Sequence, residues 1–286
     1  MNLFASPSRF EITACRSASG KTFVKDSFFT SPFKIMKPFA QDDGGIAVFL
    51  QSASPGILEG DLQLHKITVG QGASLEIRSQ SFEKIFKMDS GKCAERKIFA
   101  ELMENSSLVY RPLPCIPFSK SSFSSATEIS LSKNSRLIYE DCICAGRCAH
   151  GETFDFTLYK NQIKIFREKK LVFYDNLFLE GSDGKNHPER KERLLEKTMF
   201  AGFTHCGSML VFGYSDKVDL KKIRSILSLE EKLLYTEENT NVSLDEKKSL
   251  LVEASENDYG DFIIRCLSFS AEKIQKVFEQ VRNILK

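Results

Sequence analysis

A polar turn followed by a strand recurs three times in the first half of the chain, and this recurrence limits the possible folds more than any other feature. The copies are Gly72-Ala73-Ser74-Leu75, Asn105-Ser106-Ser107-Leu108 and Asn134-Ser135-Arg136-Leu137. A turn and a strand repeated about every 30 residues are typical of stacked β-coils, in which each layer completes the apolar face of its neighbour. A sandwich of meandering hairpins is the alternative.

The stretch from residue 54 to residue 84 shows this alternation of turns and strands in most detail. Pro55 has the φ preferred at the second position of a β-turn, and Gly56 is expected to supply the positive φ of the third. Gly60 allows a further bend directly before Asp61. A strand is then predicted over residues 62–69, so this region is β-rich and tightly turned.

Short apolar runs elsewhere predict further strands. These are Phe10–Cys15, Lys21–Lys25, Ile46–Gln51, Thr153–Tyr159 (with Phe154, Phe156 and Leu158 on one face), Ile163–Phe166, Leu171–Leu179, Ser208–Tyr214 and Phe262–Leu267. The predicted fold class is mainly β, with a body of stacked β-coils or a hairpin sandwich and two helices in the last third of the chain.

Both helices are predicted from the spacing of apolar residues. One covers residues 220–227, and the other follows Ser270, with an apolar stripe that either docks on the β body or binds a partner. The charged run 181–197 and the polar run 235–248 are interpreted as loops. The chain is therefore expected to form one domain, with a β-rich body (1–180), a charged loop and return (181–207) and a strand-helix part (208–286).

Residues 27–39 combine many large apolar side chains with Pro32 and Pro38, which exclude a helix. So many apolar groups are unexpected in a solvated loop. The segment either packs on the core or forms a partner-binding surface.

Composition narrows the function classes. A net charge of +2 over 286 residues and the lack of a basic tract argue against nucleic-acid binding. No run of about 18 apolar residues predicts a membrane span, and the N-terminal residues lack the apolar core of a signal peptide. The eight cysteines are scattered, which is typical of reduced thiols, so a cytoplasmic location is expected.

The run from Cys142 to His150 is the most conspicuous local cluster. Cys142, Cys144, Cys148 and His150 would share one face of an extended strand. Alternate residues on a strand are about 6.6 Å apart, which is too far for two sulfurs on one metal unless the chain turns at Gly146. Buried structural thiols and a metal site both remain open.

Several motifs recur, in the same order, in the urease accessory protein family UreD, also called UreH. They are Ser54-Pro55-Gly56 with Gly60-Asp61, then Gln80-Ser81-Phe82-Glu83-Lys84-Ile85, then Pro112 with Ile116-Pro117-Phe118, and finally Gly146-Arg147 with Gly151-Glu152-Thr153-Phe154. The chain resembles this family most from about Asp26 to Leu179, less around residues 203–205 and least in the final third. The residues of the second and third motifs are similar to those of the UreH branch of the family.

The resemblance implies a scaffold or chaperone rather than an enzyme, with a two-layered β-helical body. It further implies binding to a UreF-like protein, through it to the GTPase UreG, and to the urease apoenzyme, in a 2:2:2 assembly of this chain with UreF and UreG. Nickel would pass transiently through an internal polar passage, with no tightly bound cofactor. The family's structural positions match Gly56, Gly60, Gly146, Arg147 and Glu152, of which Arg147 and Glu152 would form a buried bidentate pair that locks a turn.

The positions that match the acidic lining of the family's passage are Asp61, Asp141 and Asp175. An acid flanked by apolar strand residues is costly to bury unless it is paired or hydrated, so each is a candidate transient nickel ligand. Each is equally open to interpretation as a turn-capping or surface residue. The alternative function is a β-solenoid enzyme whose carboxylate site is built from these three acids.

Overall fold

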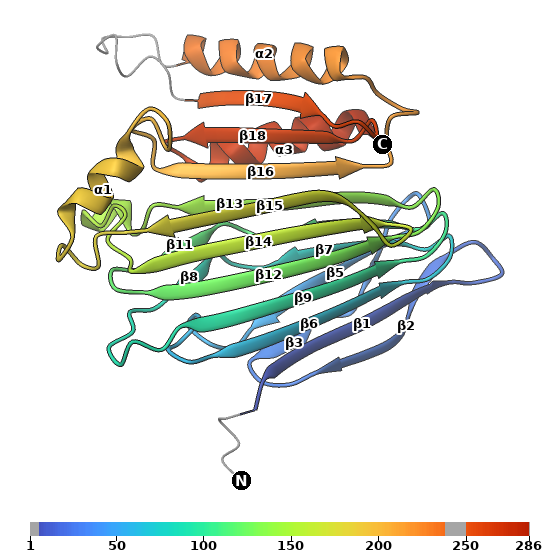
Figure 1. Ribbon diagram of the computed structural model, residues 1–286. Helices are drawn as coiled ribbons and strands as arrows, with labels where there is room; N and C mark the ends of the chain where they lie inside the picture. The colour runs from blue at the N-terminus through green and yellow to red at the C-terminus, as the bar shows by residue number, and fades with distance from the viewer. Residues whose placement is uncertain (1–5, 238–249, 286) are drawn as a thin grey trace.

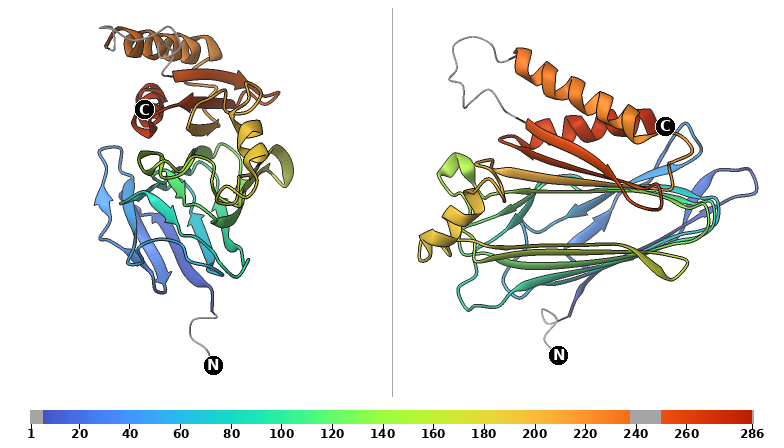
Figure 2. Two further views of the ribbon diagram at one scale, coloured as in Figure 1. Left: turned by 90° about the vertical axis from the view of Figure 1, so that its left-hand side faces the viewer. Right: turned by 45° about the horizontal axis from the view of Figure 1, so that its top comes forward.

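The computed structural model describes residues 6–237 and 250–285, which form two facing β-sheets (Figures 1 and 2). The order of the seven-stranded sheet is β15 (Lys170–Glu180), β14 (Leu158–Arg167), β12 (Ser122–Leu131), β9 (Ala94–Leu102), β6 (Leu62–Val69), β1 (Ser8–Arg16) and β2 (Thr22–Phe29). The main path of the eleven-stranded sheet is β17 (Leu250–Glu256), β18 (Phe262–Ser268), β16 (His205–Phe212), β13 (Arg136–Cys144), β10 (Ser107–Arg111), β7 (Ser74–Ser79), β5 (Ile46–Ser52) and β3 (Phe33–Ile35). The short strands β4 (Phe39–Ala40), β8 (Glu83–Ile85) and β11 (Cys115–Pro117) complete it.

The chain winds as a solenoid because it crosses repeatedly from one sheet to the other. Within the seven-stranded sheet β1, β6, β9, β12 and β14 are parallel neighbours, and within the other sheet β5, β7, β10 and β13 are. Antiparallel strands flank both parallel stacks, for example β2, β15 and β16. The prediction of a two-layered β-helical body is confirmed, and the hairpin sandwich is wrong.

The turn that occurs three times in the sequence connects a strand of the seven-stranded sheet to the next strand of the eleven-stranded sheet. Gly72, Asn105 and Asn134 each open a copy with a positive φ, a conformation that glycine and asparagine adopt at lowest cost. The strand leucines that follow are register partners, since Leu108 pairs with both Leu75 and Leu137. Each coil therefore stacks its leucine on the leucine of the preceding coil, and these side chains are buried in the apolar interior.

Two helices cover the outer face of the eleven-stranded sheet. Helix α2 spans Leu220–Glu237 and α3 spans Ala271–Leu285. The apolar stripe of α3 packs on this sheet, and Gly207 of β16 admits it, because an added Cβ would lie 2.5 Å from Ile274. In the described ranges, no helix is long and apolar enough to cross a membrane.

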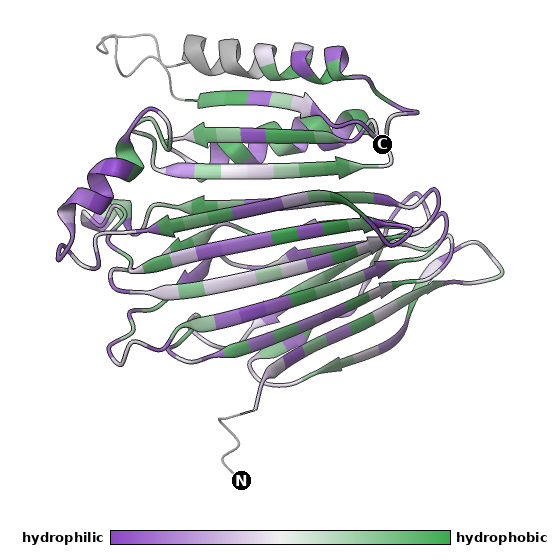
Figure 3. Ribbon diagram, viewed as in Figure 1, coloured by the Kyte–Doolittle hydropathy of each residue, from purple (hydrophilic) through white to green (hydrophobic). Residues whose placement is uncertain are grey.

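Two predictions about local structure are wrong, and one strand was missed. The charged run 181–197 contains a hydrophilic helix, α1 (Pro188–Leu195) (Figure 3). Its first turn contains a proline, a residue that is common at this position. Strand β17, which pairs with β18, was not predicted. Residues 235–237 were predicted as the start of a loop but form the end of α2. The rest of the predicted loop, 238–248, lies outside the described residues.

The strand predicted over residues 153–159 begins only at Leu158. Phe154 has a φ of 56°, and its backbone N–H donates to the carbonyl of Ala145. The rings of Phe154 and Phe156 are fully buried in an apolar cluster that residues from several successive coils share. Their alternation therefore reflects burial in a bent segment rather than a strand face.

Residues 27–39 do not pack on the core as a loop. They form the end of β2 and the strands β3 and β4, and only the ring of Phe33 is buried. Phe28, Phe29, Met36 and Phe39 are exposed, Phe39 by 57%. The interpretation of this segment as packed loop is wrong, and its role as a partner surface stays a prediction.

Candidate functional site

A row of polar side chains crosses the inner face of the seven-stranded sheet. Gln63, Arg96, Ser125 and Asn161 lie on β6, β9, β12 and β14 and are register partners from each strand to the next. Gln63, Ser125 and Asn161 are buried. Buried polar groups cost free energy unless they are hydrogen-bonded, so a continuous polar row inside a solenoid marks a region that is not simply core.

Arg96 organises the start of this row. Its side chain is 11% exposed and forms an ion pair with Glu83 of β8, while its Nε and Nη2 atoms donate to Oε1 of Gln63 at 2.9 and 2.7 Å. Burial opposes the charged form of Arg96, but Glu83 outweighs burial, so the pKa of the guanidinium is raised. Arg96 is therefore a fixed cation inside the protein, held by a fixed anion.

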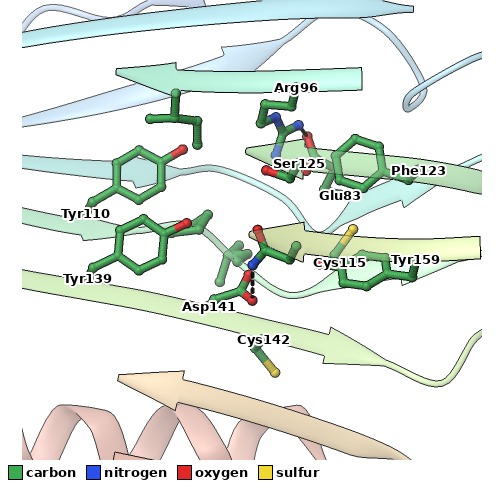
Figure 4. A pocket seen from close by; sticks show the side chains of 14 residues that line it. Glu83, Arg96, Tyr110, Cys115, Phe123, Ser125, Tyr139, Asp141, Cys142 and Tyr159 are labelled. Atoms are coloured by element: carbon green, nitrogen blue, oxygen red, sulfur yellow. Dashed lines mark hydrogen bonds and ion pairs between the residues drawn. The ribbon is translucent and has the colours of Figure 1, made fainter. Parts of the chain in front are cut away.

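Asp141 faces the row from β13 of the opposite sheet (Figure 4). Its Oδ2 accepts a hydrogen bond of 2.8 Å from the amide of Asn161, which links the two sheets. Burial raises the pKa of Asp141 to about 6, and the hydrogen bond from Asn161 offsets only part of that rise. The carboxylate is thus charged at neutral pH, and its hydrogen-bond donor is a neutral amide.

Two cavities adjoin along the row. The outer cavity, lined among others by Gln51, Gln80, Gln63 and His65, offers ≈ 80 Å³ to water. The inner cavity, lined by Ser125, Asp141 and Asn161 among others, offers ≈ 30 Å³.

Their shared wall contains Glu83, Arg96 and Tyr110. About 10–15 Å³ suffices for one water, so the outer cavity has room for several waters and the inner one for about two. The Oδ1 atom of Asn161 has no protein hydrogen-bond partner among the described residues, so water is expected there.

The three predicted acids do not meet. Asp175 lies on β15, where its Oδ2 is 2.9 Å from Nη2 of Arg265 on β18. Its charge contributes to the raised pKa of Asp141, so these two acids are neighbours. Asp61 lies in the turn before β6 and lines neither cavity. Within the described ranges no group of three or more His, Cys, Asp or Glu side chains could hold a metal ion.

Asp61 fixes its own turn. Its Oδ2 accepts a hydrogen bond of 2.8 Å from the backbone N–H of Leu58, and its own N–H donates to the Leu58 carbonyl. We expect Asp61→Ala to lower the free energy of unfolding by about 1 kcal/mol, since one such bond is lost.

Chemical denaturation of Asp61→Ala beside Asp61→Asn checks this, because asparagine keeps the accepting oxygen. An Asp61→Ala variant as stable as the unaltered protein would mean that this hydrogen bond does not hold the turn.

The four residues of the cysteine run do not all share one face, although Cys144, Cys148 and His150 line one pocket. Cys142 and Cys144 are buried on β13, and Cys142 points away from the inner cavity, towards the cluster under α3 (Figure 4). The chain then turns at Gly146, so that Cys148 and His150 fall in a short 3-10 helix. Burial raises the pKa of Cys142 well above its ordinary value, which keeps it a neutral thiol.

Arg147 and Glu152 form the predicted bidentate pair. Nε of Arg147 is 2.8 Å from Oε2 of Glu152, and Nη2 contacts Oε1. The expectation that this guanidinium is buried is wrong, since the Arg147 side chain is 39% exposed and stacks over the ring of Phe118. The pair fixes the turn at the protein surface.

The predicted glycines are constrained in two different ways. Gly60 and Gly146 have positive φ values of 74° and 145°. Gly56 does not, which contradicts its expected turn conformation; a Cβ there would lie 2.4 Å from the carbonyl oxygen of Lys84. Gly56 is required by the close approach of β8 rather than by its own backbone angles.

The polar row was missed at the sequence level, although a signal for it exists. Gln63, Ser125 and Asn161 stand at inward positions in strands whose other inward residues are mostly apolar. Such exceptions in an alternating pattern can be found in a sequence, but their alignment across strands requires the register.

The fold and the interior define a two-layered β-solenoid with a polar interior that contains two cavities. A family model described as "UreD urease accessory protein" matches residues 8–286. The chain belongs to the UreD family.

Named relatives agree with this assignment. The urease accessory protein UreH of Helicobacter hepaticus is 34% identical, over 90% of this chain and 94% of its own length. UreD of Acetivibrio thermocellus is 34% identical over 99% of both chains, and UreH of Helicobacter pylori is 34% identical over 81% of this chain and 83% of its own.

Proposed function

We propose that this protein is a urease-maturation scaffold that helps nickel enter the urease apoenzyme by way of its interior. The observation that carries the proposal is the register-aligned polar row of Gln63, Arg96, Ser125 and Asn161 facing Asp141. Family membership supports it, because the relatives are named urease accessory proteins.

The chemistry of the row suits passage better than storage. Nickel accepts carboxylate and imidazole ligands, and a transfer route needs weak ligands in succession. Glu83 is engaged by Arg96 and Asp175 by Arg265, whereas the donor to Asp141 is neutral. Asp141 is therefore the carboxylate most available to a passing cation, with Asp175 as a neighbour that strengthens the local negative potential.

The enzyme alternative finds less support. A carboxylate site built from Asp61, Asp141 and Asp175 needs the three groups in one cavity, and only Asp141 lines the inner one. Asp61 is held in its own turn and Asp175 in an ion pair. A scaffold without catalytic activity of its own is the better description.

The partners in this proposal are a UreF-like protein, a UreG-like GTPase bound through it, and the urease apoenzyme, assembled in the cytoplasm. A complex of two copies of this chain with two each of the UreF-like and UreG-like proteins is the proposed stoichiometry. Co-purification from cells expressing a urease operon, followed by mass measurement of the complex, tests both points. Turnover of a substrate by the isolated chain would favour the enzyme alternative.

A steric block tests the passage. Ser125 faces the inner cavity, whereas its neighbour Ser124 lies on the opposite face of β12. We expect the larger side chain of Ser125→Leu to fill the inner cavity, which offers only ≈ 30 Å³. Urease activation should then fall at least several-fold, while complexes still form.

Ser124→Leu is the matched control and should activate urease normally. Ser125→Val, which adds less volume, covers the case in which leucine overpacks the core. Normal activation by a folded Ser125→Leu complex would exclude this route.

A further inference from the structure

His65 carries a cost that its packing does not explain. It lies on the inner face of β6, is 2% exposed, and sits edge-on to the rings of Phe10 and Phe33, with centroids 5.4 and 4.9 Å away. Neither Nδ1 nor Nε2 has a hydrogen-bond partner in the part of the chain that the structure describes. A phenylalanine could make the same aromatic contacts without leaving two buried nitrogens unsatisfied.

The outer cavity offers the missing partner. His65 is one of its lining residues, together with Gln63, Glu83 and Arg96, and the space of ≈ 80 Å³ holds several waters or a hydrated ion. Leaving a buried polar group without any partner costs about 1–3 kcal/mol. The imidazole is therefore expected to meet water or a ligand in this cavity.

The protonation state of His65 suits a metal ligand. Burial lowers the pKa of His65 well below its ordinary value, and the charge of Arg96 lowers it further. The ring is thus neutral at neutral pH, with one nitrogen carrying a free lone pair and the other a proton. Neutral imidazole is a good ligand for nickel, copper and zinc.

The charges that face His65 permit a divalent cation. Arg96, the cation whose charge acts on His65, is paired with Glu83, which also lines the outer cavity. The neighbouring inner cavity contributes the negative charge of Asp141. A cation at His65 therefore lies beside the ion pair of Arg96 and Glu83, whose charges offset each other, with the carboxylate of Asp141 in the neighbouring inner cavity.

We propose that His65 is a transient nitrogen ligand for nickel in the outer cavity, on the way to Asp141. This inference rests on the proposed function and adds a residue to it. A single imidazole completed by water and amide oxygens binds weakly, which lets the ion move on. His65 thus acts as the first fixed ligand inside the protein, and Asp141 as the next.

The test combines a spectroscopic signature with activation. Co²⁺, a paramagnetic substitute for nickel, is added to the full-length protein or its complex, and hyperfine-shifted imidazole N–H resonances are recorded. His65→Phe preserves the aromatic packing, His65→Gln preserves polarity, and His150→Gln is a control at an exposed histidine. Urease activation and melting temperature are measured for each variant.

We expect one shifted resonance to disappear in His65→Phe and to remain in His150→Gln. His65→Phe should melt at or above the temperature of the unaltered protein, because it removes two buried nitrogens that no described protein group pairs with. It should nevertheless activate urease several-fold more slowly when nickel is scarce. The rate of urease activation by His65→Gln should lie between those of His65→Phe and the unaltered protein.

An unaltered protein without a His65 resonance, or a His65→Phe protein that keeps all of them, would overturn the site itself. If the resonance is lost but activation by His65→Phe is normal, His65 does not deliver nickel. Normal activation by Ser125→Leu as well would then point to failure of the passage as a whole.

Discussion

Gly146→Val is expected to remove most of the soluble, folded protein. The φ of Gly146 is 145°, a region that side-chain-bearing residues rarely adopt, and an added Cβ would lie 2.8 Å from the carbonyl oxygen of Glu152. Backbone strain and collision together are expected to cost roughly 3 kcal/mol or more, a large part of the stability of an ordinary domain. Soluble yield and thermal melting of the purified variant measure the effect.

Gly60→Val separates strain from collision. Gly60 also has a positive φ, of 74°, but the nearest atom to its added Cβ is the flexible end of Lys92, 3.8 Å away. This variant should therefore fold with a loss of about 1–2 kcal/mol. Equal stability of Gly146→Val and the unaltered protein would mean that the turn after β13 can change its conformation.

Asp141→Asn is expected to stabilise the protein and impair its function. The raised pKa of Asp141 in the unaltered protein means that protonation of this carboxyl favours the folded state. This contribution is complete below the ordinary pKa of an aspartate and is lost as the pH rises through about 6. At pH 7 the buried charge therefore costs stability, and asparagine removes that cost.

The neighbour of Asp141 makes asparagine a good replacement. The amide of Asn161 can still donate to the new side-chain oxygen, and the new amide can donate to Oδ1 of Asn161, which has no protein partner among the described residues. Denaturation curves at pH 7 and pH 4 should show a gain in stability for Asp141→Asn that shrinks at the lower pH. A loss of stability at pH 7 would contradict the assigned charge state.

Much of the fold could be predicted from the sequence because its signals are local. The polar turns with Gly72, Asn105 and Asn134 specify positive φ, and the leucine after each turn specifies the inward face. Local signals failed where long-range contacts decide the conformation. Phe154 and Phe156 alternate like a strand, but they are buried in a bend whose backbone bonds go to residues outside any sheet ladder.

The site could be predicted only in part, for a related reason. A carboxylate such as Asp141 stands out in an apolar strand, whereas Asp61 looks the same in the sequence and proves to hold a turn. The neutral polar residues Ser125 and Asn161 become informative only once the register aligns them with Arg96. His65 needed even more, because its significance lies in the hydrogen bonds that it lacks.

Activation of apo-urease at graded nickel concentrations tests whether nickel moves through the interior past Asp141. Complexes containing the unaltered protein or Asp141→Asn are compared at neutral pH, where Asp141 is ionised, after equal assembly has been verified by pull-down. If nickel passes Asp141, the two complexes should activate urease equally when nickel is abundant, and the Asp141→Asn complex should be several-fold slower when nickel is limiting, because asparagine is a weaker ligand without charge. Identical activation by the two complexes at every nickel concentration would contradict passage of nickel past Asp141.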